Sequence, residues 1–275
     1  MTTTQAEKGR AFSALHAGAQ AFIIPNPWDV GTAKLLAHLG FQALATTSAG
    51  YAFSMGVPDF RVGRDPMLAH VAQIAGATDL PVSADLENGF ADDPVTVADT
   101  IRLAAATGIV GGSIEDASTR PDDPIYDLGL AVERVQAAVE AARALPFTFT
   151  LTARAENYLH GRPDLADTIR RLQAYQEAGA DVLYAPGLTS KADIAAVVSS
   201  VDRPVNILMG SAGINLTLAE LSSVGVKRVS VGSALSRAAL GAFVRAGKEM
   251  REHGTFSFVD DAIPYQEISR IFGAE

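Results

Sequence analysis

The chain has 275 residues, a mass of 28.7 kDa, a formal net charge of −9 and no cysteine. The missing cysteines exclude disulfides, thiolate metal sites and a cysteine nucleophile, and the negative charge without a basic stripe argues against nucleic acid. Apolar runs are broken well before the roughly 18 residues of a membrane span, and the N-terminus has no basic region leading into an apolar one. We therefore expect a cytoplasmic protein that contacts no membrane.

A short apolar strand followed by a helix recurs eight times along the sequence. In the first unit, strand 21–25 leads to Asp29, which can cap a helix that ends near Gly40. A long loop then separates strand 42–46 from its helix 65–77. Further strands are predicted at 80–84, 109–114, 147–153, 181–185, 204–209 and 228–231. Further helices are predicted at 94–107, 127–145, 164–178, 191–200, 216–224 and 234–253.

Eight strand–helix units in this length predict one α/β domain, residues 1–275, folded as a closed parallel (β/α)8 TIM-type barrel. An open doubly wound sheet is the alternative, but no G-x-G-x-x-G follows the first strand. Helix 6–18 is predicted in the N-terminal segment, residues 1–20. In the C-terminal extension, residues 255–275, a linker over 255–259 leads to helix 263–272. The apolar side of that helix must be buried on its own barrel or on a neighbouring subunit.

Residues 80–89 are the stretch on which we expect the chemistry to centre. They begin as a strand and end in Asp85 and Glu87, whose i, i+2 spacing places both carboxylates on one face of an extended backbone. Gly89 then allows a sharp turn. Two adjacent carboxylates repel each other, so a fold that retains them supplies a cation or raises a pKa. The alternative is an ordinary aspartate that caps the next turn.

Reactive groups in such barrels lie at the carboxyl ends of the strands and in the loops that follow. Those positions hold several carboxylates and one arginine. No histidine pair stands at a ligand spacing, which argues against zinc, and hard oxygen ligands favour Mg²⁺ or Mn²⁺ held partly through waters. The candidate residues are Trp28, Thr47, Ser48, Ala49, Asp59, Asp85, Glu87, Glu115, Asp116, Arg154, Glu156, Asn206 and Ser233.

Each candidate also has a structural interpretation. Glu115 and Asp116 would suit a solvated loop or an ion pair with Arg154, and Trp28 would suit the core. Glycines in 209–213 and 231–233 stand where many barrels bind phosphate, although they equally suit closely packed turns. None of the five lysines stands at the carboxyl end of a strand, which excludes a Schiff-base aldolase.

Several motifs, each on its expected strand, resemble the isocitrate lyase/phosphoenolpyruvate mutase superfamily, most closely its carboxyphosphonoenolpyruvate phosphonomutase-like members. The similarity runs from about residue 11 to residue 254. The resemblance implies a barrel whose last helix is exchanged between subunits of a homo-oligomer, usually a tetramer. The motifs are Asn26-Pro-Trp-Asp29, Thr46-Thr-Ser-Ala-Gly50, Gly56-Val-Pro-Asp59, Ala84-Asp-Leu-Glu-Asn-Gly-Phe90, Ser113-Ile-Glu-Asp116, Thr152-Ala-Arg154 and Pro204-Val-Asn206.

The resemblance also implies roles for individual residues. Arg154 and the backbone N–H groups of residues 47–49 would hold a substrate carboxylate. The position of Asp85 implies Mg²⁺ bound there, with water-mediated help from three further acids: Asp59, Glu87 and Glu115.

The chain departs from the lyases of this family in its loops. Those lyases carry a mobile loop of Lys-Lys-Cys-Gly-His type that supplies an acid/base thiol, whereas the loop here, residues 117–126, has no Cys, Lys or His. Ser113 stands where they have His, and strand six ends in Ala185-Pro-Gly187 where they have a functional Glu. The thiol route is therefore not expected. The predicted sources of a proton lie in the loop: Arg120, Asp122 or Tyr126.

We therefore predict a Mg²⁺-dependent enzyme that cleaves or rearranges a C–C or C–P bond next to the carbonyl of a small 2-oxo or 2-hydroxy acid. The reaction would pass through an enolate, which needs a fixed positive charge. A phosphonomutase or C–P hydrolase acting on a phosphonopyruvate-type substrate is an alternative, as is a phosphate-ligand barrel or an inactive binding module. The predicted catalytic residues are Arg154, Glu115, Asp59 and Tyr126. The predicted substrate-binding residues are Trp28, Thr47, Ser48, Ala49, Arg154 and Asn206.

Overall fold

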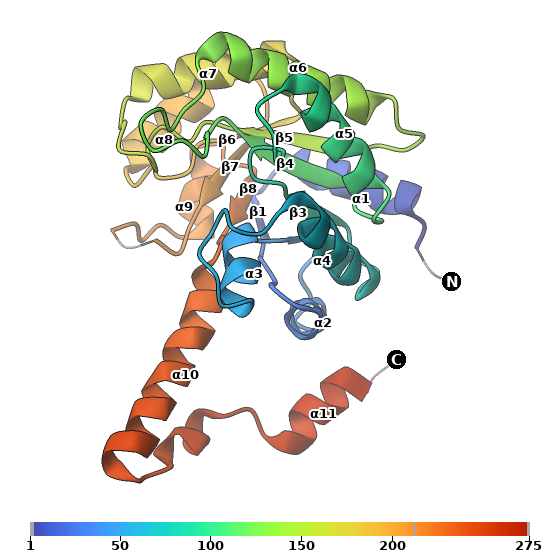
Figure 1. The fold of residues 1–275 in the computed structure, drawn as a ribbon. Helices are drawn as coiled ribbons and strands as arrows, with labels where there is room; N and C mark the ends of the chain where they lie inside the picture. The colour runs from blue at the N-terminus through green and yellow to red at the C-terminus, as the bar shows by residue number, and fades with distance from the viewer. Residues whose placement is uncertain (1–2, 212, 274–275) are drawn as a thin grey trace.

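A computed structural model describes residues 3–211 and 213–273 and contains eight parallel strands in the order β1-β8-β7-β6-β5-β4-β3-β2. The two end strands approach each other, because the Ala45 N–H donates to the Pro25 carbonyl at 3.1 Å. The sheet is therefore a nearly closed barrel of the predicted (β/α)8 kind (Figure 1). The strands are β1 Phe22–Ile24, β2 Leu44–Ala45, β3 Val82–Asp85, β4 Gly111–Glu115, β5 Thr150–Arg154, β6 Val182–Tyr184, β7 Val205–Leu208 and β8 Arg228–Ser230.

The barrel helices begin where the sequence predicts them. Asp29, Asp93, Asp127 and Asp164 each accept a hydrogen bond from the backbone N–H three residues further on, which satisfies a free donor of the first turn. All but the last of these helices lie around the strands, whereas the last follows β8 and runs outward (Figure 1). In chain order they are α2 Val30–His38, α4 Arg64–Gly76, α5 Pro94–Ala105, α6 Leu128–Arg143, α7 Leu165–Glu177, α8 Lys191–Ser199, α9 Leu218–Ser223 and α10 Ala234–His253.

Two short helices occupy segments that the sequence analysis left as loop or linker. Helix α3, Ser48–Ser54, follows β2 and is capped by the Thr47 hydroxyl, which accepts from the Gly50 N–H at 3.2 Å. The 3₁₀ helix η1, Ser257–Asp261, is held by the carboxylate of Glu249, whose Oε1 accepts from the Ser257 N–H at 2.5 Å. Neither segment is long or periodic enough to carry a helical pattern in the sequence.

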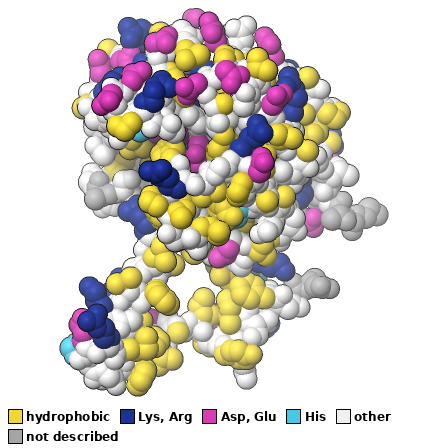
Figure 2. Space-filling view, viewed as in Figure 1, with side chains coloured by type: hydrophobic (Ala, Val, Ile, Leu, Met, Phe, Trp, Pro, Cys, Tyr) yellow, Lys and Arg dark blue, Asp and Glu magenta, His cyan; other side chains and the backbone are white. Residues whose placement is uncertain are grey.

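The C-terminal part of the chain projects from the barrel. Helix α10 runs outward, and α11, Tyr265–Gly273, returns toward the barrel, where it contacts α2 (Figure 1). Hydrophobic side chains cover much of both segments (Figure 2), including Phe243, which is 77% exposed. No helix within residues 3–211 and 213–273 has the length and apolar character needed to cross a bilayer.

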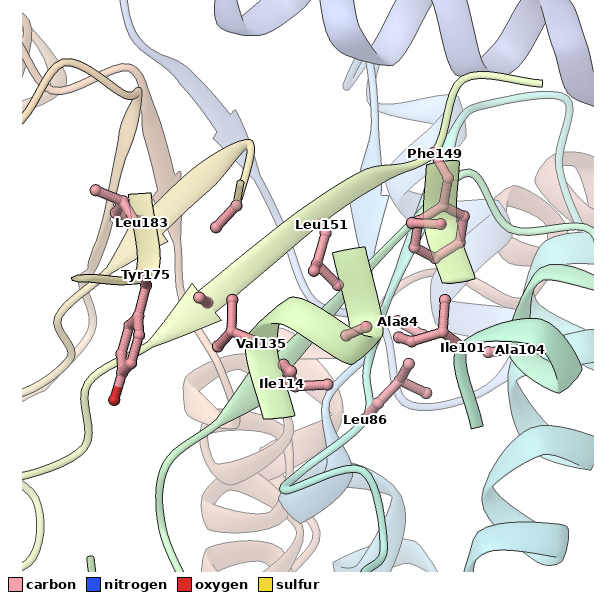
Figure 3. Close-up of a cluster of buried hydrophobic side chains, with 14 of the residues drawn as sticks. Ala84, Leu86, Ile101, Ala104, Ile114, Val135, Phe149, Leu151, Tyr175 and Leu183 are labelled. Carbon is pink, nitrogen blue, oxygen red and sulfur yellow. The ribbon is translucent and has the colours of Figure 1, made fainter. Parts of the chain in front are cut away.

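The main core lies between the strands and the surrounding helices. Figure 3 shows Ala84 and Leu151 of the sheet facing Ile101 of α5 and Val135 of α6, and these side chains are at most 4% exposed. Burial of this kind contributes on the order of 25 cal/mol per Å² of apolar surface.

Helix α1, Gln5–His16, closes the end of the barrel opposite the predicted site. Its Phe12 is fully buried with Phe22 of β1 and Val110, which precedes β4. Gly111 makes room for that ring, because a Cβ at this position would lie 2.8 Å from Phe12 Cε1. The interior is therefore sealed at the amino ends of the strands, and access is from their carboxyl ends.

Candidate active site

A cavity of about 160 Å³ lies inside the barrel at the carboxyl ends of the strands. A volume of this size holds a molecule of several heavy atoms, since one water takes about 30 Å³. The parallel register brings Glu115, Arg154 and Tyr184 side by side on β4, β5 and β6. The lining residues that matter below are Thr47, Ser48, Ala49, Asp59, Asp85, Ser113, Glu115, Arg154, Tyr184, Asn206, Arg228 and Ser230.

Arg154 is the centre of an ion-pair network in this cavity. Its guanidinium lies 3.0 Å from Asp85 Oδ1, 3.0 Å from Glu115 Oε2 and 2.8 Å from Glu156 Oε1. Burial alone would lower the pKa of Arg154, but the three carboxylates outweigh it and raise that pKa well above its usual range. Arg154 is therefore a permanent cation, and one cation faces three acids.

Asp85 is held in place from two sides. Its Oδ2 accepts hydrogen bonds from the Ser48 backbone N–H at 3.0 Å and from the Ser48 hydroxyl at 2.9 Å. Its own N–H donates to the Thr46 hydroxyl at 2.9 Å. Helix α3 therefore begins against the predicted metal ligand, which gives the unpredicted helix a role in the site.

Glu87 does not share a face with Asp85. The prediction that their i, i+2 spacing places both carboxylates on one face of an extended strand was therefore wrong. Strand β3 ends at Asp85, and Glu87 has a left-handed backbone with φ +49°, which breaks the extended geometry. Glu87 lines an adjoining recess rather than the main cavity, and Phe60 lines both. The two carboxylates still lie near enough for Asp85 to raise the pKa of Glu87, after burial, to about 8.

Two buried carboxylate oxygens have no hydrogen-bond partner among the described residues: Oε1 of Glu87 and Oε1 of Glu115. Burial raises the pKa of Glu115 well above its ordinary value, against the attraction of Arg154. Burial and then Asp85 also raise the pKa of Asp59. An unpaired buried carboxylate is costly, so these acids hold a proton in the metal-free protein or are stabilised by an added positive charge.

These donors fit a hydrated divalent ion better than a directly ligated one. Carboxylate oxygens are the ligands that Mg²⁺ prefers, and Mg²⁺ commonly retains several waters. Across residues 3–211 and 213–273, no three acids or histidines converge closely enough to ligate an ion together. The bare oxygens of Glu87 and Glu115 are therefore suited to hydrogen-bond to metal-bound waters.

The structure separates the predicted substrate-binding residues into two groups. Residues 47–49 and Asn206 line the cavity beside Arg154. Trp28 lies outside its lining and packs against α3, where a Cβ on Gly50 would come within 3.2 Å of Trp28 Cβ. Trp28 therefore supports the helix that holds Asp85.

The loop predicted to supply a proton does not reach the cavity lining. The Tyr126 hydroxyl donates to Asp92 at 2.5 Å and accepts from the Asn88 amide at 3.0 Å. Arg120 forms an ion pair with Asp92 at 2.6 Å, and Asp122 is exposed. In this conformation all three predicted donors are outside the cavity, and the Tyr126 hydroxyl already donates its proton in a hydrogen bond to Asp92.

The glycine turn after β8 is engaged by the protein itself. The Val231 and Gly232 N–H groups both donate to the Asn26 side-chain oxygen at 2.9 Å, and the Asn26 amide donates to the Thr46 carbonyl at 3.0 Å. Asn26 thus joins β1, β2 and β8 where the barrel closes. These two N–H groups are not free for a phosphate, which removes the support that the turn after β8 gave to the phosphate-ligand alternative.

The cavity residues that sequence reasoning missed include Tyr184, Arg228 and Ser230. Arg228 is 5% exposed and contacts Asn206 Oδ1 at 2.9 Å and Thr152 Oγ1 at 3.0 Å. Tyr184 is the last residue of β6, so the rule of carboxyl strand ends could have found it. Arg228 is the first residue of β8, so its side chain reaches the cavity from the amino end of the strand. A search restricted to the carboxyl ends of strands cannot find it.

Comparison with known proteins agrees with this geometry. The phosphoenolpyruvate phosphomutase family model matches residues 12–251. The chain belongs to this family, within the isocitrate lyase/phosphoenolpyruvate mutase superfamily. A Burkholderia cenocepacia protein, provisionally described as a lyase/mutase, has a solved structure with 65% identity and a TM-score of 0.96, and the match covers 98% of this chain and 97% of the other.

Two further relatives in the family carry named activities. The 2-methylisocitrate lyase of Escherichia coli is 29% identical over 93% of this chain and 88% of its own. A solved phosphonopyruvate hydrolase, in complex with oxalate and Mg²⁺, is 25% identical with a TM-score of 0.85, and covers 96% of this chain and 94% of its own. The superfamily, and with it lyase or mutase chemistry, agrees with the resemblance inferred from the motifs.

Proposed function

We propose that this chain is a Mg²⁺-dependent enzyme, for which Mn²⁺ is a substitute, acting on a small 2-oxo or 2-hydroxy acid. It would cleave a bond next to the carbonyl and leave an enolate. One observation carries the proposal. Three acids share the charge of Arg154, and the Oε1 atoms of Glu87 and Glu115, which have no hydrogen-bond partner among the described residues, suit the waters of a bound cation.

In this proposal Asp85 holds the ion, and Asp59, Glu87 and Glu115 act through its waters. Arg154, residues 47–49 and Asn206 line the space for the substrate. When bound, the ion supplies positive charge beside the 2-oxygen of the substrate. Arg154 is rigidly held by its carboxylates and presents a fixed charge to the substrate carboxylate, which needs no reorganisation during the reaction.

The bond that breaks is C–C or C–P. The similarity to 2-methylisocitrate lyase favours the first, and the similarity to phosphonopyruvate hydrolase keeps the second as a candidate. A panel of 2-oxo acids, malate derivatives and phosphonopyruvate separates them. Release of pyruvate with inorganic phosphate identifies C–P cleavage, and pyruvate from a phosphorus-free substrate identifies C–C cleavage.

Oxalate binding tests the proposal without knowledge of the substrate. Oxalate resembles an enolpyruvate and chelates Mg²⁺, so calorimetry should detect binding with Mg²⁺ and none in EDTA. Equal affinity in EDTA would contradict the chelation of substrate by a bound ion. If oxalate binds in neither condition, the proposed function is refuted and only the assignment of the fold remains.

We also propose that a second copy of the chain covers the apolar surfaces of α10, η1 and α11, in a dimer or tetramer. Exposed side chains in this part of the chain support the proposal, because a monomer rarely leaves such a patch in water. They are Leu240, Phe243, Val244, Met250, Phe256, Val259, Ile263, Tyr265 and Phe272.

A further inference from the structure

Three tyrosines are buried in or behind the barrel wall, and only one has a hydroxyl proton to give. Tyr126 donates to Asp92 at 2.5 Å, and Tyr175 donates to Asp116 at 2.5 Å. The Tyr184 hydroxyl donates to no acceptor within residues 3–211 and 213–273; its one polar neighbour is Ser230 Oγ, which donates to it across 3.5 Å. That contact is long, so the hydroxyl is available to a ligand.

Tyr184 stands at the place where a reaction would occur. It ends β6, lines the cavity and is 7% exposed. The β5–β6 register sets it beside Arg154, whose guanidinium lies over the ring at 5.0 Å from the centroid. A substrate carboxylate held by Arg154 would therefore lie next to this phenol.

The surroundings allow the phenol to lose and regain a proton. Burial raises the pKa of Tyr184 to about 12, so the group is protonated at neutral pH. Arg154 and the Ser230 hydroxyl act in the opposite direction, because both favour the phenolate. Arg228 lies beneath them without a carboxylate partner in the described residues, and a phenolate at Tyr184 would also attract it.

We propose that Tyr184 is the proton donor of this site, a role that rests on the function proposed above. When the C–C or C–P bond breaks, its electron pair remains on the retained fragment as an enolate. The departing carbon becomes a carbonyl group as its hydroxyl proton passes to water, or the departing phosphoryl group is taken up by water as phosphate. The enolate carbon takes the proton of the Tyr184 hydroxyl: the O–H bond breaks, a C–H bond forms, and a phenolate remains. Water returns a proton to the phenolate and leaves as hydroxide, which closes the cycle.

This assignment fills the gap left by the loop at residues 117–126. The loop has neither thiol nor lysine nor histidine, and its Tyr126 is turned away from the cavity. Tyr184 comes from a strand, so it is present at the site whether or not the loop moves.

Proton exchange into pyruvate measures this role directly. By microscopic reversibility, the group that protonates the enolate also removes a methyl proton from bound pyruvate, and in D₂O it returns a deuteron. The wild-type protein with Mg²⁺ should exchange the pyruvate methyl protons, as followed by ¹H NMR. Tyr184→Phe should slow the exchange by about 10²-fold or more, a typical effect of losing a general acid–base group.

Oxalate affinity and a matched variant separate this role from others. Tyr184→Phe should bind oxalate with Mg²⁺ as the wild type does, and Tyr158→Phe, outside the cavity lining, should exchange normally. Wild-type exchange in Tyr184→Phe, or loss of oxalate binding along with exchange, would refute the proton-donor role. A wild-type protein that binds oxalate but exchanges nothing would also refute it. A wild-type protein that binds no oxalate with Mg²⁺ would instead overturn the proposed function.

A second substitution tests the same role if the Tyr184→Phe variant folds poorly. Placing 3-fluorotyrosine at position 184 keeps the hydroxyl and lowers the pKa of the phenol. The pH profile of exchange should then shift to lower pH, and an unchanged profile would contradict the proposal.

Discussion

Arg154 Nη1 lies 3.0 Å from Asp85 Oδ1, and the two side chains are only 13% and 17% exposed. The contact orients Asp85 from one side while Ser48 holds its other oxygen. An ion at Asp85 would therefore bind next to a fixed guanidinium. That arrangement places two positive charges around one small cavity, as the chelation of an anionic enolate requires.

Removing Arg154 should destabilise the metal-free protein strongly. Arg154→Ala would leave Asp85, Glu115 and Glu156 without their cation, and breaking a buried ion pair costs about 3–5 kcal/mol. Urea unfolding in EDTA measures the loss. Arg102→Ala, at an exposed pair with Asp99, should cost no more than about 1 kcal/mol. Equal losses in the two variants would mean that the Arg154 network does not stabilise the fold.

Removing the charge of Asp85 should abolish Mg²⁺ binding. Asp85→Asn keeps the size of the side chain and a partner for Ser48, so the fold should persist while calorimetry detects no ion. Asp65→Asn, on an aspartate whose side chain is 87% exposed, is the control and should bind Mg²⁺ normally. Unchanged Mg²⁺ affinity in Asp85→Asn would show that the ion, if it binds, is held elsewhere.

The fold was largely predictable because its signals are local and repeated. Each barrel helix follows a short apolar strand, and aspartates such as Asp93 and Asp127 mark helix starts with the capping geometry that the structure shows. Closure of the barrel was predicted only by counting strands. The residue that joins its ends, Asn26, binds groups 20 and 205 positions away, which no local pattern encodes.

The site was predictable only in part, because strand ends could be counted but side-chain directions could not. The acids and Arg154 were found from their positions after strands. The left-handed backbone of Glu87 was not, since a non-glycine residue rarely adopts it and nothing in the sequence marks it. Tyr126 was chosen by its residue type, and its contact with Asp92 appears only once the loops are placed.

The outer helices should control the size of the assembly. Phe243 is 77% exposed on α10, and Phe243→Asp would place a charge in the surface proposed to contact a second copy. Light scattering after size-exclusion chromatography should then give a smaller mass than for the wild type. Glu140→Lys, on the exposed surface of α6, should leave the mass unchanged. A wild-type protein that is already monomeric would refute the proposed assembly.

The stability of the metal-free protein should fall as the pH rises from about 4.5 to about 8, and the contribution of Glu87 to this fall should level off above that pH. Burial, with Asp85 and Asp59, raises the pKa of Glu87 from its model-peptide value of 4.5 to about 8, so between these values the folded state retains a proton that the unfolded state has lost. Rising pH then favours unfolding, by at most about 1.4 kcal/mol per pH unit for one proton.

Urea unfolding in EDTA at pH 5.5, 7 and 8.5 tests this dependence on Glu87. Glu87→Gln removes the titrating group and should flatten the profile over that range. Glu140→Gln, on the surface of α6, is the control and should keep the wild-type slope. Saturating Mg²⁺ should also flatten the wild-type profile, because the cation offsets the charge of the ionised carboxylate. A slope that is the same in Glu87→Gln as in the wild type would assign the proton uptake to a different buried acid.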